Sequence, residues 1–403
     1  MKVLMSAYAC EPGKGSEPGA GWAWTRAAAL DNEVWVMTRE NNREAIEGAL
    51  RMEPNLRLTP IYLDLPKWAR WWKRGGVGLR LYYVIWQGLA RRRAKQVHAQ
   101  IHFDVAHHIT FAVDWLPAGV VGLQGLPSVW GPVGGSAEFQ WRLRPWLGWR
   151  GVLGEVARIV LGGAARLIFG TWTVSRAAVV VAQNHEVADR FASSNPRIEP
   201  NVAVPPASLG RPPEIKSLPG LRTALFVGRL TAWKGIRLAV ETIAQPALES
   251  WNLAVYGAGP ESARAMKLAV RLGVESRVEF LGHRPREEVL NAYNTADALL
   301  FPSMHDSAGW AVAEAISVGL PVVCLDLCGP RVILERSGLG IAVPIDRKTP
   351  ARLASALGQV RRIDPSQTAT SSVGNDRLPI LLREWFFDAT SAVATPPGPK
   401  LPA

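Results

Sequence analysis

The chain has 403 residues, of which 48% are apolar and 20% are charged, so it is globular and too long for one hydrophobic core. Its formal net charge of +12 favours anionic partners such as phosphates, nucleic acid or an acidic membrane surface. The three cysteines, Cys10, Cys324 and Cys328, are too few for a disulfide framework and indicate a reducing compartment.

Short apolar runs alternate with helix-like segments over residues 1–205. "KVLMSAY", "EVWVMT", "DVAHHI" and "AAVVVAQN" have the length and composition of buried strands, and "GWAWTRAAAL" and "NREAIEGAL" those of helices. This alternation predicts parallel βαβ units and a Rossmann-like domain. The longest apolar stretch, residues 151–182, carries four charged residues, so we expect no membrane-spanning helix and a cytoplasmic protein.

A second α/β domain is predicted after a proline-rich linker at residues 206–220. The alternation restarts over residues 221–375 with "TALFVG", "NLAVYGAG", "RVEFLG", "ALLFPS" and "PVVCLD" as strands. Residues 376–391 read as one amphipathic helix, and residues 392–403 as a flexible tail. The predicted fold class is therefore α/β, with two Rossmann-like domains whose parallel sheets face each other across a cleft.

Glycines crowd the loop after the first strand, "ACEPGKGSEPGAGWAW". Gly13, Gly15 and Gly19 let the backbone approach a ligand closely and precede a helix N-terminus, which attracts anions. The alternative is a plain flexible turn. The spacing departs from the dinucleotide fingerprint G-x-G-x-x-G, so NAD binding is a weak interpretation.

Two cations lie in "GRLTAWKG", the loop after the strand "LFV" of the second domain. Arg229 and Lys234 would lie at the carboxyl end of a parallel sheet, where open α/β folds bind ligands. Two fixed cations there favour an anion, most simply a phosphate, over a solvated turn.

Two carboxylates, Asp306 and Glu314, stand eight positions apart in "HDSAGWAVAEAISVG". Residues 307–310 would present free backbone N–H groups at a helix start, a further anion site. Asp306 could be ordinary N-terminal charge and Glu314 a solvated face, but Glu314 stands among Ala and Val, where an unpaired carboxylate is costly.

These segments together resemble the donor half of glycosyltransferase family 4, retaining enzymes of the GT-B fold (glycosyltransferase group 1 type). The resemblance runs through "FVGRLTAWKG", "YGAGP", "RVEFLGHRPREEVLNAYNTADALLFPS" and "HDSAGWAVAEAISVGLPVVCLD". It extends to "SAYACEPGKGSEPGAGW" and "DVAHHIT" in the first domain.

The resemblance implies a nucleotide-diphosphate sugar as donor and assigns roles to the residues that match its motifs. Arg229 and Lys234 hold the diphosphate, Glu314 the ribose, and Asp306, one methylene shorter than the family's glutamate, the donor sugar. His108 is expected at the reacting edge of the sugar, with its neighbour His107 as the alternative. The other implied donor-binding residues are Gly13, Gly15, Gly19, Gly228, Gly282, His283, Ala308, Gly309 and Trp310.

The reaction that this resemblance implies is transfer with retention at the anomeric carbon, without metal or cofactor and without a glycosyl-enzyme intermediate. Electrostatic stabilisation of the leaving diphosphate would supply the catalysis. The acceptor is unknown, with lipid-linked and cell-envelope glycans as candidates. The alternatives are a non-catalytic sugar- or nucleotide-binding relative, a nucleotide-sugar epimerase of the same plan, and a basic nucleic-acid binder, which no motif supports.

A basic, tryptophan-rich segment occupies residues 67–95, with nine basic residues, four tryptophans and no acidic residue, and residues 141–150 repeat its composition. Tryptophan beside Arg and Lys suits the headgroup zone of an anionic bilayer, which predicts a peripheral protein at the inner face of the membrane. An aromatic acceptor groove, packing between helices and nucleic-acid stacking are the alternatives. The membrane-contact candidates are Trp68, Trp71, Trp72, Lys73, Arg74, Arg91, Arg92 and Arg93.

Overall fold

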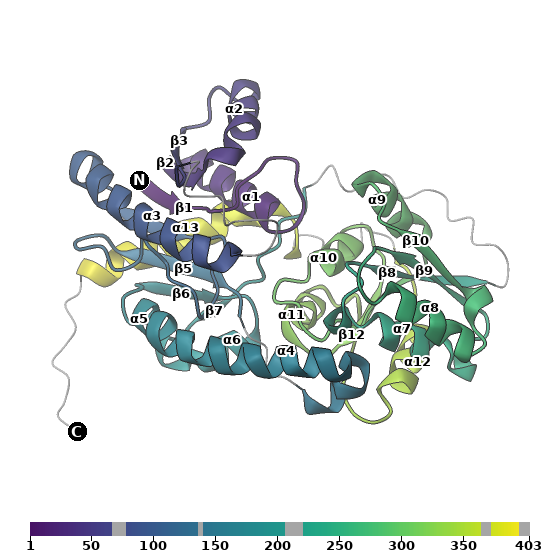
Figure 1. The fold of residues 1–403 in the computed structure, drawn as a ribbon. Helices are drawn as coiled ribbons and strands as arrows, with labels where there is room; N and C mark the ends of the chain where they lie inside the picture. The colour runs from purple at the N-terminus through teal and green to yellow at the C-terminus, as the bar shows by residue number, and fades with distance from the viewer. Residues whose placement is uncertain (67–77, 136–139, 206–220, 364–371, 395–403) are drawn as a thin grey trace. The chain divides into compact units, whose positions relative to one another are not determined.

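A computed structural model describes residues 1–66, 78–135, 140–205, 221–363 and 372–394 (Figure 1). These residues form two compact units. Unit 1 comprises residues 1–135, 160–203 and the C-terminal residues from 375, and unit 2 comprises residues 136–159 and 204–374. The described chain therefore has the predicted α/β architecture, with one Rossmann-like parallel sheet in each unit.

Unit 1 is built on a seven-stranded parallel sheet with strand order β3-β2-β1-β4-β5-β6-β7. Its strands are β1 (Lys2–Ser6), β2 (Glu33–Arg39), β3 (Leu58–Leu63), β4 (Val105–His108), β5 (Ser128–Val133), β6 (Val179–Ala182) and β7 (Arg197–Ile198). Its helices include α1 (Ser16–Asp31), α2 (Arg43–Met52), α3 (Leu79–Ile101), α5 (Thr171–Val174), α6 (His185–Arg190) and α13 (Leu378–Ala394). The order of the strands reverses between β1 and β4, which makes their carboxyl ends a switch point where ligands bind in such folds.

The last helix, α13, belongs to unit 1, although it follows the whole of unit 2 in the chain (Figure 1). The rings of Trp24 in α1 and Trp385 in α13 stack with their centroids 5.1 Å apart, and both side chains are fully buried. Burial of these two large aromatic surfaces fixes the returning helix to the first unit.

Unit 2 is built on a six-stranded parallel sheet with strand order β10-β9-β8-β11-β12-β13. Its strands are β8 (Arg222–Val227), β9 (Trp251–Tyr256), β10 (Val278–Gly282), β11 (Ala298–Phe301), β12 (Val322–Leu325) and β13 (Gly340–Val343). Its helices include α7 (Ile236–Ile243), α8 (Ser262–Arg271), α9 (Arg286–Thr295), α10 (Trp310–Ser317), α11 (Cys328–Ser337) and α12 (Thr349–Gln359). The switch point of this sheet lies between β8 and β11.

Helix α4 (Arg144–Ala165) crosses the boundary between the units. The predicted first domain, residues 1–205, included all of it, but residues 136–159 group with unit 2. The reason is apolar packing, because Leu143, Trp146 and Leu147 are buried in the same core as α7 and β8. The Trp146 indole N–H also donates to the Glu241 carboxylate of α7 at 2.7 Å. The predicted linker, residues 206–220, and the predicted tail from residue 395 onward lie outside the described residues.

Candidate active site

The loop after β8 holds the two predicted phosphate-binding cations. Arg229 is exposed, and Lys234 ends a short 3-10 turn. Gly235 follows with φ of +77°, and a Cβ there would lie 2.1 Å from the Pro302 carbonyl oxygen. Only glycine allows this approach, so the sequence "WKG" lets the β8 loop pack directly against the loop that follows β11.

Lys234 and Asp306 meet at the switch point between β8 and β11. The Lys234 ammonium lies 2.5 Å from one carboxylate oxygen of Asp306, and the Gly309 backbone N–H donates to the other at 2.9 Å. Burial would raise the pKa of Asp306, but Lys234 and the N–H of Gly309 outweigh burial and hold it below its ordinary value. Asp306 is therefore ionised at neutral pH and forms an ion pair with Lys234, which is half-buried.

Gly309 caps the amino end of α10 in the left-handed conformation, with φ of 75°. The backbone of residues 307–309 is held close to α11, because a Cβ on Gly329 would lie 2.3 Å from the Ser307 carbonyl oxygen. Ala308 and Trp310 are half-buried at this helix start. The helix dipole and the backbone N–H groups of its first turn add positive potential beside Lys234.

Glu314, on α10, is the second predicted carboxylate and is only 7% exposed. Its oxygens lie 2.6 Å from the Arg286 guanidinium of α9 and 3.4 Å from the Tyr293 hydroxyl. Burial raises the pKa of Glu314, and the charge of Arg286 opposes that rise. Arg286 was not predicted from the sequence. The feature that could have pointed to it is an arginine at the first position of a helix that carries acidic residues in the same turn.

The remaining donor-binding residues predicted in unit 2 lie where parallel strands end. Gly228 follows β8 with φ of 149°, and its carbonyl oxygen would be 1.9 Å from a Cβ on Gly257 after β9. Gly282 ends β10 with φ of 72° and accepts a hydrogen bond from the Gly257 N–H at 2.8 Å. His283 comes next and is exposed. The structure thus places these residues on neighbouring loops of one sheet edge; their contact with a donor stays a prediction.

Unit 1 places both candidate histidines in its core at the end of β4. His107 is fully buried, with its Nε2 2.7 Å from the Gly131 carbonyl oxygen and its ring against Trp385 and Phe386 of α13. His108 is 1% exposed, and its Nε2 lies 3.1 Å from the Tyr83 hydroxyl. Burial lowers the pKa of His107 to about 4 and that of His108 to about 3, so both are neutral at pH 7.

The glycine-rich loop of unit 1 has internal reasons for part of its composition. A Cβ on Gly19 would lie 1.9 Å from the Lys14 carbonyl oxygen, whereas Gly13 has open space around it and φ of +74°. Gly15 is the cap residue of α1. Gly19 therefore packs the loop onto its own helix, whereas the missing side chain of Gly13 leaves room.

Glu17, in the first turn of α1, is a polar group of this edge that sequence reasoning did not single out. Its carboxylate accepts the Phe111 backbone N–H at 2.5 Å, just after β4. Burial raises the pKa of Glu17, and this hydrogen bond partly offsets the effect. The sequence feature that could have pointed to Glu17 is an acidic residue at the start of a helix that follows a glycine-rich loop.

The predicted membrane contacts fall into two groups. Trp68, Trp71, Trp72, Lys73 and Arg74 lie outside the described residues. On α3, Arg91 is half-buried and donates to the carbonyl oxygens of three residues, Gly119, Val121 and Gly122, so it supports a loop of unit 1. Arg92 and Arg93 are exposed.

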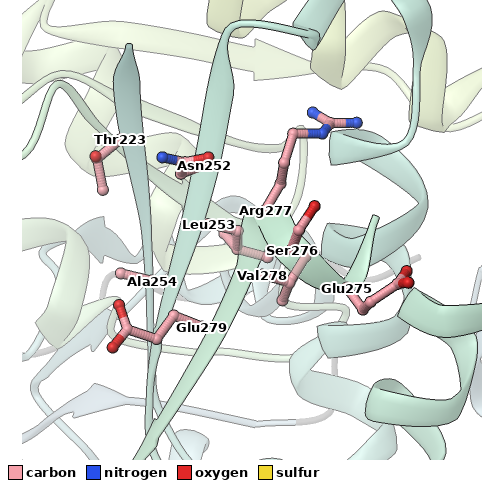
Figure 2. Close-up of a pocket in the computed structure, with 9 residues that line it drawn as sticks. All are labelled: Thr223, Asn252, Leu253, Ala254, Glu275, Ser276, Arg277, Val278 and Glu279. Carbon is pink, nitrogen blue, oxygen red and sulfur yellow. The ribbon is translucent and has the colours of Figure 1, made fainter. Parts of the chain in front are cut away.

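Figure 2 shows a hollow of about 350 Å³ in unit 2 that is separate from the charged cluster. Thr223 and Asn252 line it near the amino ends of β8 and β9, and Glu279 lies at the start of β10. Lys234 and Asp306 lie beyond the carboxyl ends of the sheet, so the hollow is at the opposite end of the strands. Ligands of open α/β sheets bind at the carboxyl ends, which leaves this hollow without a role in the site.

Within the ranges that the structure describes, no three His, Cys, Asp or Glu side chains gather as metal ligands would. No described helix is both long and apolar enough to cross a membrane.

The fold and the charged edge of unit 2 define a two-domain α/β protein of the GT-B class. Residues 213–370 match the family described as "Glycosyl transferases group 1". The fold resembles that of sucrose-phosphate synthase from Thermosynechococcus elongatus, with a TM-score of 0.63 and 15% identity over 97% of this chain and 99% of that one. A glycosyltransferase from Rickettsia africae gives a TM-score of 0.60 at 12% identity, over 96% and 98% of the two chains.

Two curated relatives match part of the chain. A D-inositol 3-phosphate glycosyltransferase of Corynebacterium efficiens is 34% identical over 158 residues, 36% of each chain. A 2-deoxystreptamine glucosyltransferase of Streptomyces kanamyceticus is 29% identical over 229 residues, 54% of this chain and 55% of the relative. The chain thus spans between about a third and about half of the length of these two relatives.

Proposed function

We propose that the protein is a glycosyltransferase that takes a sugar from a nucleoside-diphosphate sugar bound at the carboxyl edge of the unit 2 sheet. The observation that carries this proposal is the ion pair of Lys234 and Asp306, placed at the switch point beside the start of α10. A paired lysine at a helix N-terminus is a ready site for a diphosphate, which can take the place of the carboxylate on the ammonium.

Each group of this edge has a role in the proposed reaction. Lys234, Arg229 and the N–H groups at the start of α10 stabilise the charge that develops on the diphosphate as the glycosidic bond breaks. Asp306, released from Lys234, accepts hydrogen bonds from sugar hydroxyls. Glu314 accepts from the ribose hydroxyls, and Arg286 keeps it ionised and oriented.

The acceptor hydroxyl is proposed to attack the face of the sugar that the diphosphate leaves, and its proton passes to the departing diphosphate oxygen. The configuration at the anomeric carbon is then retained without a covalent enzyme intermediate. Electrostatic stabilisation needs no metal, so transfer should persist in excess EDTA. NMR of the fresh product gives its anomeric configuration, and an inverted product would contradict this mechanism. A lipid-linked or cell-envelope glycan is the proposed acceptor class.

A thermal-shift panel of UDP-, GDP- and ADP-sugars tests donor binding. A donor that binds only the native state raises the melting temperature with the logarithm of its concentration. We expect one nucleotide series to stabilise the wild type and Lys267→Ala, an exposed lysine on α8 that serves as control, but not Lys234→Ala. Equal stabilisation of both variants would remove Lys234 from the site.

Product analysis separates this function from its rivals. Stabilisation by a donor with no turnover on any acceptor would indicate a binding protein. Epimerised donor in the absence of an acceptor would indicate an epimerase of the same fold.

A further inference from the structure

Helix α9 carries two of the side chains that contact Glu314, although little of the helix is buried. Arg286 begins the helix and Tyr293 lies two turns later, and both reach the Glu314 carboxylate of α10. Of the ten described residues of α9, two, Ala292 and Tyr293, are buried, whereas six of the eight residues of α10 are buried. Apolar burial therefore fixes α10 more firmly than α9, and the placement of Arg286 and Tyr293 needs further support.

Arg362, in the segment that follows α12, supplies that support at the carboxyl end of α9. Its Nη1 donates to the carbonyl oxygens of Tyr293 and Ala296 at 2.9 Å and 2.8 Å. Its Nη2 donates to the carbonyl oxygen of Val318, the residue that ends α10, at 3.0 Å. The last carbonyl groups of a helix have no partner within the helix, so one planar side chain joins the open ends of both helices.

The charge of Arg362 suits this place. The carboxyl ends of two helices carry partial negative charge, and a guanidinium that contacts both ends is stabilised by both. Burial lowers the pKa of Arg362, and the charge of Asp297, just after α9, opposes this effect. The segment that carries Arg362 is anchored to the sheet, because the Arg222 guanidinium of β8 donates to the Val360 carbonyl oxygen at 3.0 Å. Arg362 therefore ties both helices to a fixed part of unit 2.

We propose that Arg362 is a positioning residue for nucleotide binding, which holds Glu314 in place for the ribose hydroxyls by joining the ends of α9 and α10. It acts through Tyr293, whose carbonyl oxygen accepts from Arg362 and whose hydroxyl lies against Glu314. It acts on Glu314 also through the end of α10, one turn away at Val318. The inference rests on the proposed function, in which Glu314 accepts hydrogen bonds from the ribose, and it adds a residue that lies outside the predicted site.

The expected consequence of this role is a preference for nucleotides that carry ribose hydroxyls. Hydrogen bonds to a carboxylate are among the stronger ones, so the wild type should bind a nucleoside diphosphate at least about tenfold tighter than its 2′,3′-dideoxy analogue. Without Arg362, α9 can shift against α10, and Glu314 loses the groups that orient it. The preference should then fall by at least about fivefold, while binding of the dideoxy analogue changes by less than about twofold.

Isothermal titration of the full chain measures this preference with UDP, GDP and ADP, each beside its 2′,3′-dideoxy analogue. Arg362→Ala is compared with Arg361→Ala as the matched control. Arg361 is the preceding residue, is exposed and donates to the carbonyl oxygens of Gly358 and Val360 at the end of α12. We expect Arg361→Ala to keep the wild-type preference and Arg362→Ala to lose it. In a Glu314→Gln background, Arg362→Ala should change the preference no further, because Glu314 is the group through which it acts.

Arg362→Lys is the second variant, for the case in which circular dichroism shows that Arg362→Ala does not fold. An ammonium lacks the planar fork that spans both helix ends, so the preference should fall in this variant as well. A folded Arg362 variant that keeps the wild-type preference would overturn the inference. So would an equal loss of ribose and dideoxy nucleotides, because Arg362 would then support the fold and not the placement of Glu314.

Two results with the wild type separate this inference from the proposed function. Equal binding of ribose and dideoxy nucleotides would overturn the inference alone, because a nucleotide site would exist without a contact between Glu314 and the ribose. Binding of none of the six nucleotides would overturn the proposed function, and the inference with it.

Discussion

The carboxyl edges of the two sheets carry polar groups of different kinds. In unit 2, Lys234 pairs with Asp306 and Arg286 with Glu314, and each pair keeps one partly exposed member. In unit 1, the same position of the sheet holds His107 and His108, which are buried and neutral.

This difference decides which edge has a cation that can change its partner when a charged ligand arrives. A half-exposed ion pair can give its cation to an arriving anion at little desolvation cost, because the cation remains paired throughout. The side chains of His107 and His108 are buried, and their Nε2 atoms are already bonded to the Gly131 carbonyl oxygen and the Tyr83 hydroxyl. The edge of unit 2 therefore carries partly exposed charged groups, whereas the two histidines of unit 1 belong to its core.

The largest expected effect is a loss of transfer activity in a variant of Asp306, which is proposed to contact the sugar and not the diphosphate. Asp306→Asn should lower kcat/KM for transfer by about 100-fold, as expected when a charged group leaves a preorganised site. It should not weaken binding of the nucleoside diphosphate alone, because Lys234 loses a competing carboxylate. Calorimetric titration with the diphosphate and initial rates with the sugar nucleotide give the two values.

An equal loss in both values would place Asp306 on the diphosphate side and remove the distinction. Asp326→Asn, an acidic residue beyond β12 of the same sheet, is the control and should leave both values unchanged.

The buried neutral histidines of unit 1 should make the stability of the protein depend on pH. The pKa of His108 is about 3 in the folded protein, below its ordinary 6.5, so the unfolded chain alone takes up a proton between these values. Stability from this group is complete above pH 6.5 and is lost as pH falls towards 3. Between pH 7 and 5 the loss amounts to about 2 kcal/mol.

His108→Gln, which can still bond to Tyr83, should reduce the slope of unfolding free energy against pH by about one proton in urea titrations between pH 5 and 7. An unchanged slope in His108→Gln would mean that this histidine is not held neutral by the fold.

The smallest expected effect is on the free energy of unfolding, when a half-buried ion pair and an exposed ion pair are each broken. Arg286→Ala leaves Glu314 buried without its cation and should lower the free energy of unfolding by about 1–2 kcal/mol. Arg284→Ala breaks an exposed pair with Glu288, 3.7 Å long, and should cost less than about 0.5 kcal/mol. Glu314→Gln in the Arg286→Ala background should recover part of the loss, and urea midpoints measure all three.

Equal losses in Arg284→Ala and Arg286→Ala would show that Glu314 does not depend on its arginine.

Much of the fold was predictable because local pattern and burial agree there. The strands β1, β2, β4 and β8 to β12 are short apolar runs that end at turn residues, and each was predicted. The strands β3, β7 and β13 were missed: β3 contains Pro60 and is only partly buried, β7 is two residues long, and β13 is half-buried at a sheet edge. Edge strands carry weaker apolar signals than strands that are covered on both faces.

The candidate site was predictable where one loop carries the signal. Lys234, Asp306 and Glu314 stand beside glycines and helix starts, so their type and position point to an anion. Arg286 could not be found in this way, since its partner lies 28 positions later and only the packing of α9 against α10 brings them together.

By itself, the sequence determined the number of domains, the parallel α/β class and the loops that carry charge, because periodicity, glycine placement and net charge act locally. Only the tertiary structure decided which carboxylate pairs with which cation and that α13 returns to unit 1. These features depend on contacts between residues far apart in the chain, where burial of Trp385 or pairing of Arg166 with Asp114 outweighs local preference.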